Sequence, residues 1–469
     1  MSFEVLSSLG YLATSSLALL LFGVHGGFQG KTPSQLPILF SLSAGALMLT
    51  ALLLLDFGQD LTFPLGDSNL VNDPFGRKAS LLILLGGAVY LFTSSSFWTF
   101  PRTKKEKRTV EPPLLVMLGI LGMILLLNSQ HILLSFLCLE MQSLAMYTLA
   151  GSHSQSSFGT EAGLKYFFLG ALASTFFIYG MSMSYGAIGS MKYMDIESFL
   201  AGCDTNVYGI QLGMAGLMAG FLFKLGVVPF HQWVPDIQEG ADTETAFFFA
   251  IVPKVALAIA LIRLVEMYLA SPLANFSQVA LGVLAFASIL WGSVAALRQR
   301  SIKRLLGYSA IGHGGYSLLS TSCGTPEGFQ STLFYWVIYV PTSIYLWLLI
   351  LAQPVRNRFN LDINMLARKP AFGMGAALML FSLAGIPPLG GFFAKWWILE
   401  ATVGVGLYSL AVSVVLVAVI GAFYYLRLIQ VTCLEQTGVW EKREFCGKDK
   451  ATIMGIALVW VLFAGAFAL

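Results

Sequence analysis

Four ionisable side chains lie deep inside long apolar segments of this chain: Glu140, Lys224, Lys254 and Lys395. On insertion scales, a charged residue at the centre of a membrane helix costs roughly 3 kcal/mol. A sequence that keeps four such residues is expected to use them, and the usual use of an intramembrane ionisable group is the transport of protons or ions. The alternatives are structural: a static ion pair that fixes helix packing, or lysines that extend to the membrane surface.

Glu140 and Lys224 have the residue types of a proton switch. The carboxylate lies about midway along HILLSFLCLEMQSLAMYTL, and the lysine lies in FLFKLGVVPF, little more than one turn before Pro229. On neighbouring membrane helices, opposite charges offset each other's burial, and a change in their separation changes the proton affinity of the lysine. The pair is therefore a candidate for a proton site controlled by charge separation.

Three further groups extend this set. Lys254, in FFFAIVPKVALAIAL, could relay protons between Lys224 and the second half of the chain. His313 lies among glycines in YSAIGHGGYSLL; an imidazole can carry a proton near neutral pH, but a lone histidine could equally be a packed core residue. Lys395 in GGFFAKWWIL and Lys165 in TEAGLKYFFLGALAS lie nearer segment ends, so extension to the surface is the alternative for both.

The composition indicates the element type that must position these groups. Of 469 residues, 57% are hydrophobic and 11% are charged, whereas soluble domains carry about 25% charged residues. The sequence predicts an all-α polytopic membrane protein with about fourteen transmembrane helices, because helices satisfy their own backbone in lipid and no alternating barrel pattern is present. The apolar segments cover 10–23, 37–55, 79–99, 112–127, 131–149, 162–185, 207–232, 244–268, 276–297, 303–320, 330–352, 372–400, 403–427 and 450–468.

Basic residues divide unevenly between alternate loops. The odd-numbered loops hold 18 Lys and Arg residues, whereas the even-numbered loops hold only Arg77, Lys78 and Lys192. Lys and Arg concentrate on the inner side of a membrane. The odd loops are therefore expected to face the matrix or cytoplasm, with both termini on the outer side.

Proline interrupts two of the segments. The seventh reads FLFKLGVVPFHQWVPD and the twelfth reads SLAGIPPLGGFFAKWW. Proline removes a backbone donor and clashes one turn back, so each helix should break, and a broken membrane helix persists only where it is buried or lines a wet cavity. The breaks lie five spans apart, so spans 4–8 and 9–13 would form two inverted five-helix repeats. The predicted organisation is a three-helix segment with a basic loop over 1–111, repeats over 112–268 and 276–430, and a C-terminal loop and helix over 431–469.

Residues after the first break are expected at the membrane surface. His231 is expected at the interface with Trp233 as an aromatic anchor. The acidic run of Asp236, Glu239, Asp242 and Glu244 is expected to be a solvated loop face, with proton collection as the alternative.

Other classes of site lack their motifs. No GxGxxG follows a strand and no Walker loop is present, so the chain should not bind a dinucleotide or hydrolyse ATP. No histidines are spaced for haem or metal, and the five cysteines form no CxxC pair and are interpreted as packing residues. A net charge of +3 without a basic aromatic patch gives no indication of nucleic acid. The energy for transport must come from partner chains or an ion gradient.

From about residue 112 to 430, the chain resembles the antiporter-like membrane subunits of proton-pumping NADH:quinone oxidoreductase, respiratory complex I. The motifs are FKLGVVPFHQWVPDIQEG followed by VPK, KRLLGYSAIGHGGY, and AGIPPLGGFFAK. EAGLKYFFLGALAS is similar to the subunit-2 branch, and GTPEGFQS and FYYLRLI resemble its plant and algal mitochondrial members. Gln238 and the segment GADTETAF depart from the family pattern in the loop after the seventh span.

The resemblance implies proton-translocation roles for six residues. Glu140 and Lys224 match the family's carboxylate–lysine pair, and Lys254 matches its bridging lysine. The others are the central histidine His313, the lysine of the second half-channel Lys395, and Lys165, typical of this subunit.

The same resemblance implies a setting. The chain would be a subunit of H⁺-translocating NADH:ubiquinone reductase, a multi-pass protein of the mitochondrial inner membrane or, alternatively, of a bacterial plasma membrane. NADH, FMN, iron–sulfur clusters and ubiquinone would bind partner subunits and not this chain. Its expected partners are other membrane-arm subunits, including neighbouring antiporter-like ones, and lipids. The alternatives are a subunit of a multisubunit sodium/proton antiporter and a structural subunit that pumps nothing.

Overall fold

The structure is a computed structural model that describes residues 10–19, 21, 32–56, 63–65, 69–99, 111–152, 156–202, 208–269, 274–352, 370–431 and 448–467. Within these ranges the chain is almost entirely helical, which confirms the predicted all-α class. The helices are α2 (Thr32–Asp56), α3 (Pro74–Thr99), α4 (Glu111–Asn128), α5 (Ile132–Ala150), α6 (Ser157–Ile188), α7 (Tyr193–Ala201), α8 (Tyr208–Leu225), α9 (Trp233–Gly240), α10 (Thr243–Leu269), α11 (Ala274–Leu297), α12 (Ile302–Ser322), α13 (Pro326–Leu351), α14 (Pro370–Ala384), α15 (Gly390–Gly404), α16 (Tyr408–Ile429) and α17 (Lys448–Phe467). A short antiparallel hairpin joins β1 (Phe63–Leu65) to β2 (Leu70–Asn72).

Ten helices in the described ranges are long and apolar enough to cross a membrane. Four of the fourteen predicted spans fall outside this set, namely 10–23, 303–320, 372–400 and 450–468, and two of them do so for local reasons. The twelfth span is divided into α14 and α15, of 15 residues each, and α12 is rich in glycine and serine. The number of about fourteen spans therefore stays a prediction. The basic residues of the third and eleventh loops, from Arg102 to Arg108 and from Arg356 to Lys369, lie outside the described residues.

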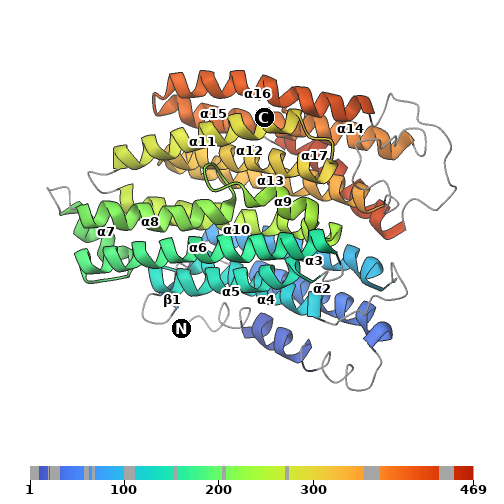
Figure 1. Cartoon of the computed structure of the whole chain (residues 1–469), viewed down its shortest axis with the longest axis horizontal. Helices are drawn as coiled ribbons and strands as arrows, with labels where there is room; N and C mark the ends of the chain where they lie inside the picture. The colour runs from blue at the N-terminus through green and yellow to red at the C-terminus, as the bar shows by residue number, and fades with distance from the viewer. Residues whose placement is uncertain are drawn as a thin grey trace. The chain divides into compact units, whose positions relative to one another are not determined.

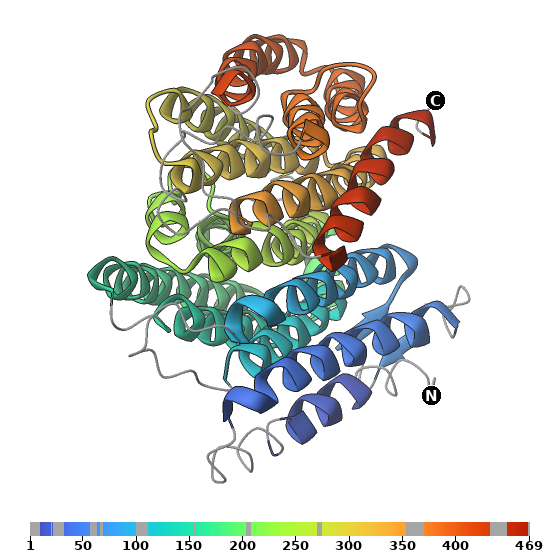
Figure 2. The same ribbon diagram turned by 90° about the vertical axis from the view of Figure 1, so that its right-hand side faces the viewer.

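The chain divides into two compact units that do not follow the predicted repeat boundaries. Unit 1 comprises residues 1–221 and 252–272, and unit 2 comprises 222–251 and 273–469. Within each unit the long helices lie side by side (Figure 1), and the turned view in Figure 2 shows the same arrangement. The repeat boundaries at 112–268 and 276–430 stay a prediction.

Unit 1 brings three even-numbered loops together at one end. The amide of Gln130 donates to the carbonyl of Asn69 at 2.8 Å, and its carbonyl accepts from the amide of Tyr193 at 3.0 Å. The amide of Ile132 donates to the carbonyl of Met191 at 2.9 Å. Loops 2, 4 and 6 therefore share one end of the unit, as the alternation of basic residues predicts.

Unit 2 joins the odd-numbered loops 7 and 9. The ammonium of Lys303 donates to the carbonyls of Glu239 at 3.0 Å and Ala241 at 2.6 Å, at the end of α9. Arg304 forms ion pairs with Asp236 and Glu239 at 3.1 and 2.9 Å. These contacts place both loops on the same side of the unit.

The same region corrects the interpretation of the acidic run. Asp236 and Glu239 are half-buried against Arg304, and Glu244, in the first turn of α10, is only 2% exposed. The run is therefore not a solvated loop face. Two of its carboxylates, those of Asp236 and Glu239, fold back onto unit 2, where Arg304 offsets their charge.

Both predicted helix breaks are present and have the same local form. α8 ends at Leu225 and α14 ends at Ala384, and each is followed by a glycine with positive φ, Gly226 at 76° and Gly385 at 85°. The amides after each end bond back to one carbonyl, that of Leu222 or of Phe381. Glycine takes this left-handed conformation without steric cost, so it closes each half-helix.

Candidate functional site

The centre of unit 2 is a buried histidine held by hydroxyl groups. His313 lies on α12 and is 4% exposed. Its Nδ1 shares a hydrogen bond with the hydroxyl of Tyr335 on α13, and its Nε2 shares one of 2.8 Å with Tyr425 on α16. The hydroxyl of Tyr425 also bonds to that of Ser309. A neutral imidazole donates through one nitrogen and accepts through the other, so this chain of groups can pass a proton across the ring.

Lys395 occupies the second helix break. Its Nζ donates to the carbonyls of Leu383 at 2.7 Å and Ala384 at 2.9 Å, the last two residues of α14. It also lies 5.1 Å from the ring centre of Tyr316. The last carbonyls of a helix lack intrahelical donors and carry a partial negative charge, so they are a natural partner for an ammonium group. Lys395 therefore points into the unit and does not extend to a surface.

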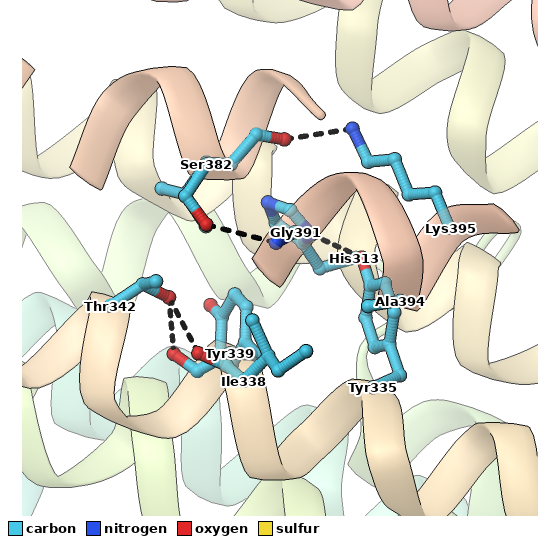
Figure 3. A pocket seen from close by; sticks show the side chains of 10 residues that line it. His313, Tyr335, Ile338, Tyr339, Thr342, Ser382, Gly391, Ala394 and Lys395 are labelled. Carbon is cyan, nitrogen blue, oxygen red and sulfur yellow. Dashed lines mark hydrogen bonds between the residues drawn. The ribbon is translucent and has the colours of Figure 1, made fainter. Parts of the chain in front are cut away.

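A small cavity connects these two groups. Its volume is about 10 Å³, room for about one water molecule, and His313 and Lys395 both line it (Figure 3). The other polar lining groups are Tyr335, Tyr339, Thr342 and Ser382. Small-molecule sites are usually about 300–1,000 Å³ and lined mainly by apolar groups. This cavity is smaller and carries several hydroxyls, which suits water between a histidine and a lysine.

Lys254 is the most completely buried of the predicted lysines. It lies on α10, whose apolar stretch is 100% buried, and its side chain is 4% exposed. Among the described residues, no group hydrogen-bonds to its Nζ. An ammonium held without a partner is costly to bury, so this nitrogen requires water or proton exchange.

Glu140 and Lys224 fall in different units. In unit 1, the half-buried carboxylate of Glu140 accepts a hydrogen bond of 2.5 Å from the hydroxyl of Ser174 on α6. Lys224 is half-buried in the last turn of α8, two residues before Gly226. Glu140 is thus held by a contact with α6, and Lys224 lies beside the first helix break. Their pairing stays a prediction.

Lys165 lies on an exposed face of α6. Its ammonium forms an ion pair of 2.7 Å with Glu161 one turn earlier, and the two side chains are 44% and 58% exposed. An exposed pair of this kind contributes about 0.5 kcal/mol to stability. The role of Lys165 in proton transfer stays a prediction.

The predicted interfacial anchor is wrong. Trp233 is 7% exposed, and its indole nitrogen donates to the carbonyl of Phe223 at 2.9 Å, near the end of α8. The half-buried ring of His231 packs edge-on against Trp291 with ring centres 5.7 Å apart. The indole is a second donor to this carbonyl, which also accepts from the amide of Gly226 at 3.0 Å, and this bond holds the ring inward at the helix break.

Sequence reasoning missed the hydroxyl partners of His313 and an ion pair in unit 1. Tyr335 and Tyr425 lie 22 and 112 residues from the histidine. In unit 1, the guanidinium of Arg263 on α10 binds the carboxylate of Asp73 at the start of α3. The sequence shows Arg263 as a second basic residue in the apolar segment that holds Lys254, but it does not indicate that Asp73 is the partner of Arg263.

Comparison with known proteins identifies relatives over nearly the whole chain. Residues 129–421 match the family model described as the membrane region of NADH:quinone oxidoreductase and Mrp antiporters. NADH-quinone oxidoreductase subunit N of Parvibaculum lavamentivorans is 37% identical over 456 residues, which cover 96% of this chain and 92% of the relative.

Solved structures give the same fold. A chain of respiratory complex I from Thermus thermophilus superposes with a TM-score of 0.81 and 29% identity, covering 98% of this chain and 96% of that one. A chain of the Mrp complex from Dietzia sp. has a TM-score of 0.82 at 19% identity, covering 100% and 95%, and shows the fold alone.

Proposed function

Because this chain belongs to the family of NADH:quinone oxidoreductase and Mrp antiporter membrane subunits, we propose that it translocates protons within a respiratory complex I. The observation that carries the proposal is the cavity of unit 2, which holds His313 and Lys395 with four hydroxyl-bearing side chains. A carrier of organic solutes would need a larger site.

His313 would act as the central relay. A proton arriving at one ring nitrogen releases the proton of the other, and the neighbouring hydroxyls rotate to restore the starting bonds. Water in the cavity would connect this relay to Lys395, which holds its proton against the carbonyls of Leu383 and Ala384. Glu140, Lys224 and Lys254 would complete the set of proton-carrying residues, with separation of Glu140 and Lys224 tuning the affinity of the lysine for its proton.

Redox chemistry would take place on other chains. The sequence has neither a dinucleotide motif nor a cysteine pattern for an iron–sulfur cluster, so NADH, FMN, the clusters and quinone would bind partner subunits. The expected neighbours are other antiporter-like membrane subunits and lipids. The mitochondrial inner membrane remains our proposed location from motif resemblance, although the curated relatives include bacterial proteins such as the Parvibaculum subunit.

The test is proton stoichiometry in the intact complex. His313→Phe keeps a ring in the buried site and removes both nitrogens, so we expect a lower H⁺/e⁻ ratio in proteoliposomes while the complex still assembles. Tyr185→Phe, on an exposed position of α6, is the matched control and should pump normally. An assembled His313→Phe complex with an unchanged ratio would remove the proposed role.

The two alternatives predict other results. A sodium/proton antiporter subunit would purify without flavin and iron–sulfur proteins and would exchange sodium for protons without NADH. A purely structural subunit would tolerate neutral replacements of all the buried charges, with normal pumping by every assembled variant.

A further inference from the structure

The helix that carries His313 lies against the segment that follows the first helix break. A Cβ added at Gly314, the residue after the histidine, would lie 3.1 Å from Cγ1 of Val227. A Cβ added at Gly307 would lie 3.1 Å from Cα of Pro235 in α9. α12 therefore approaches this segment closely at two levels, which are about two helical turns apart.

Two cations at the start of α12 attach it to α9. Lys303 is 1% exposed, and its ammonium donates to the backbone carbonyls of Glu239 and Ala241. Arg304 binds side chains instead: one guanidinium nitrogen lies 3.1 Å from the carboxylate of Asp236, and another lies 2.9 Å from that of Glu239. Asp236 and Glu239 are three residues apart in α9, so their side chains share one face of that helix. Lys303 thus holds the backbone of α9, and Arg304 holds one face of its side chains.

Stability is a weak reason for the contacts of Arg304. Its side chain is 34% exposed, and those of Asp236 and Glu239 are 28% and 32% exposed. Ion pairs that water still reaches contribute little to the free energy of unfolding. A guanidinium, however, presents its donors in a fixed plane, so binding two carboxylates on one helix face fixes the orientation of that helix against its neighbour. The arrangement therefore suits the orientation of α12 more than its stability.

Attachment at two neighbouring residues restrains rotation of α12 about its own axis. Successive residues of an α-helix point roughly 100° apart, so Lys303 and Arg304 hold α9 from two directions. Gly307 and Gly314 carry no side chain, so the two close contacts at these residues offer little resistance to the same rotation. α12 runs from Ile302 to Ser322 without a proline, so a rotation at its start is carried along the helix.

The hydrogen bonds of His313 are sensitive to such a rotation. The histidine follows Arg304 by nine residues, or roughly 14 Å along the helix. A side chain lies roughly 5–6 Å from the helix axis, so a rotation of roughly 10° moves the imidazole by roughly 1 Å. The bond between its Nε2 and the hydroxyl of Tyr425 is 2.8 Å long, and bonds of this kind extend to about 3.2 Å. A small rotation of α12 is therefore enough to break this bond or the bond of Nδ1 to Tyr335.

We propose that Arg304 is a positioning residue for His313. Its contacts with the two carboxylates of α9 fix the rotation of α12, and that rotation sets the two hydrogen bonds of the imidazole. The proposal rests on the proton-translocating function above and deepens it, because it makes part of the acidic run a support for the proton relay. Loss of the arginine would leave the histidine present but misplaced, so its effect should disappear when the histidine itself is absent.

The experiment compares single and double variants of the whole complex in proteoliposomes. Arg304→Gln removes the charge that binds both carboxylates, and Arg304→Lys keeps a positive charge. Arg304→Gln combined with His313→Phe tests whether the two residues act at one place. Arg300→Gln is the matched control, because it makes the same change at an exposed position four residues earlier. The measurements are assembly, thermal unfolding, NADH:quinone rate with an uncoupler present, and H⁺/e⁻.

We expect Arg304→Gln to assemble and to lower H⁺/e⁻ by no more than His313→Phe does, while Arg304→Lys keeps most of the ratio and Arg300→Gln keeps all of it. The double variant should lose no more than His313→Phe alone. A normal ratio in assembled Arg304→Gln beside a reduced ratio in His313→Phe would overturn the positioning role and leave the proposed function intact. So would a double variant that loses more than His313→Phe. A normal ratio in both single variants would instead remove the proposed function.

Glu239→Gln provides the test if Arg304→Gln fails to assemble. It removes one of the two carboxylates and leaves Arg304 its contact with Asp236, so we expect a smaller loss of H⁺/e⁻. That loss should again be absent when the substitution is combined with His313→Phe. A normal ratio in assembled Glu239→Gln, beside a reduced ratio in His313→Phe, would then overturn the positioning role.

Discussion

Gly391, the second residue of α15, should not accept even one added methyl group. A Cβ placed there would lie 1.8 Å from the carbonyl oxygen of Ser382 in α14 and 2.8 Å from its hydroxyl oxygen. Ordinary contacts begin at 3.4 Å, so the two half-helices would have to separate by roughly 1.5 Å in Gly391→Ala. The clash is with a backbone atom, which cannot turn away as a flexible side chain would.

The displacement would act on Lys395, which lies one helical turn after Gly391. Its two hydrogen bonds to the end of α14 are 2.7 and 2.9 Å long, and a shift of roughly 1.5 Å would break both. Overpacking of this kind costs about 1–3 kcal/mol and sometimes more. We therefore expect Gly391→Ala to lower the thermal stability of the complex and to reduce H⁺/e⁻ in the fraction that assembles.

Gly404, the last residue of α15, gives a control on the same helix. A Cβ at Gly404 would meet nothing within 4 Å, so Gly404→Ala should be neutral or stabilising by up to about 1 kcal/mol. The assays are assembly on native gels, thermal unfolding and proton stoichiometry. If Gly391→Ala matched Gly404→Ala in all three, the close approach of the two half-helices would be refuted.

Three further substitutions test other contacts. Lys224→Ala should lower H⁺/e⁻ in an assembled complex, and an unaltered ratio would contradict the assigned role. Lys303→Met leaves two carbonyls at the end of α9 without their donor and should destabilise the fold by about 1–3 kcal/mol; exposed Arg300→Met is the comparison in thermal unfolding, and equal stability of the two would count against the contact. Tyr425→Phe removes the hydroxyl shared with His313 Nε2 and should slow proton-coupled turnover without loss of assembly, so wild-type turnover would exclude that hydroxyl from the relay.

Local features were predictable from the sequence. The breaks near Pro229 and Pro387 follow from the chemistry of proline and from a preceding glycine, all within ten residues of chain. The burial of Lys254 and His313 follows from the apolar segments around them. Such predictions need only neighbours in sequence.

Features that depend on distant partners could not be predicted. Asp73 meets Arg263 across 190 residues, and periodicity carries no information about that pairing. The general preference of tryptophan for membrane interfaces predicts a surface position for Trp233, but its indole donates to the carbonyl of Phe223 at the helix break and is buried. The acidic run of which Glu244 is part predicts a solvated face, whereas the burial of Glu244 arises from tertiary packing.

The partner of Lys395 has a consequence for reversibility. A lysine held by a carboxylate leaves a bare anion behind when its proton departs, and that anion pulls the proton back. The carbonyls of Leu383 and Ala384 carry only the fractional charge of a helix end, roughly half an electron at most, and they cannot titrate. Lys395 can therefore lose and regain its proton without leaving a full negative charge in the membrane. The direction of proton flow at this position is then set by which neighbouring groups deliver protons to Lys395 and which accept them.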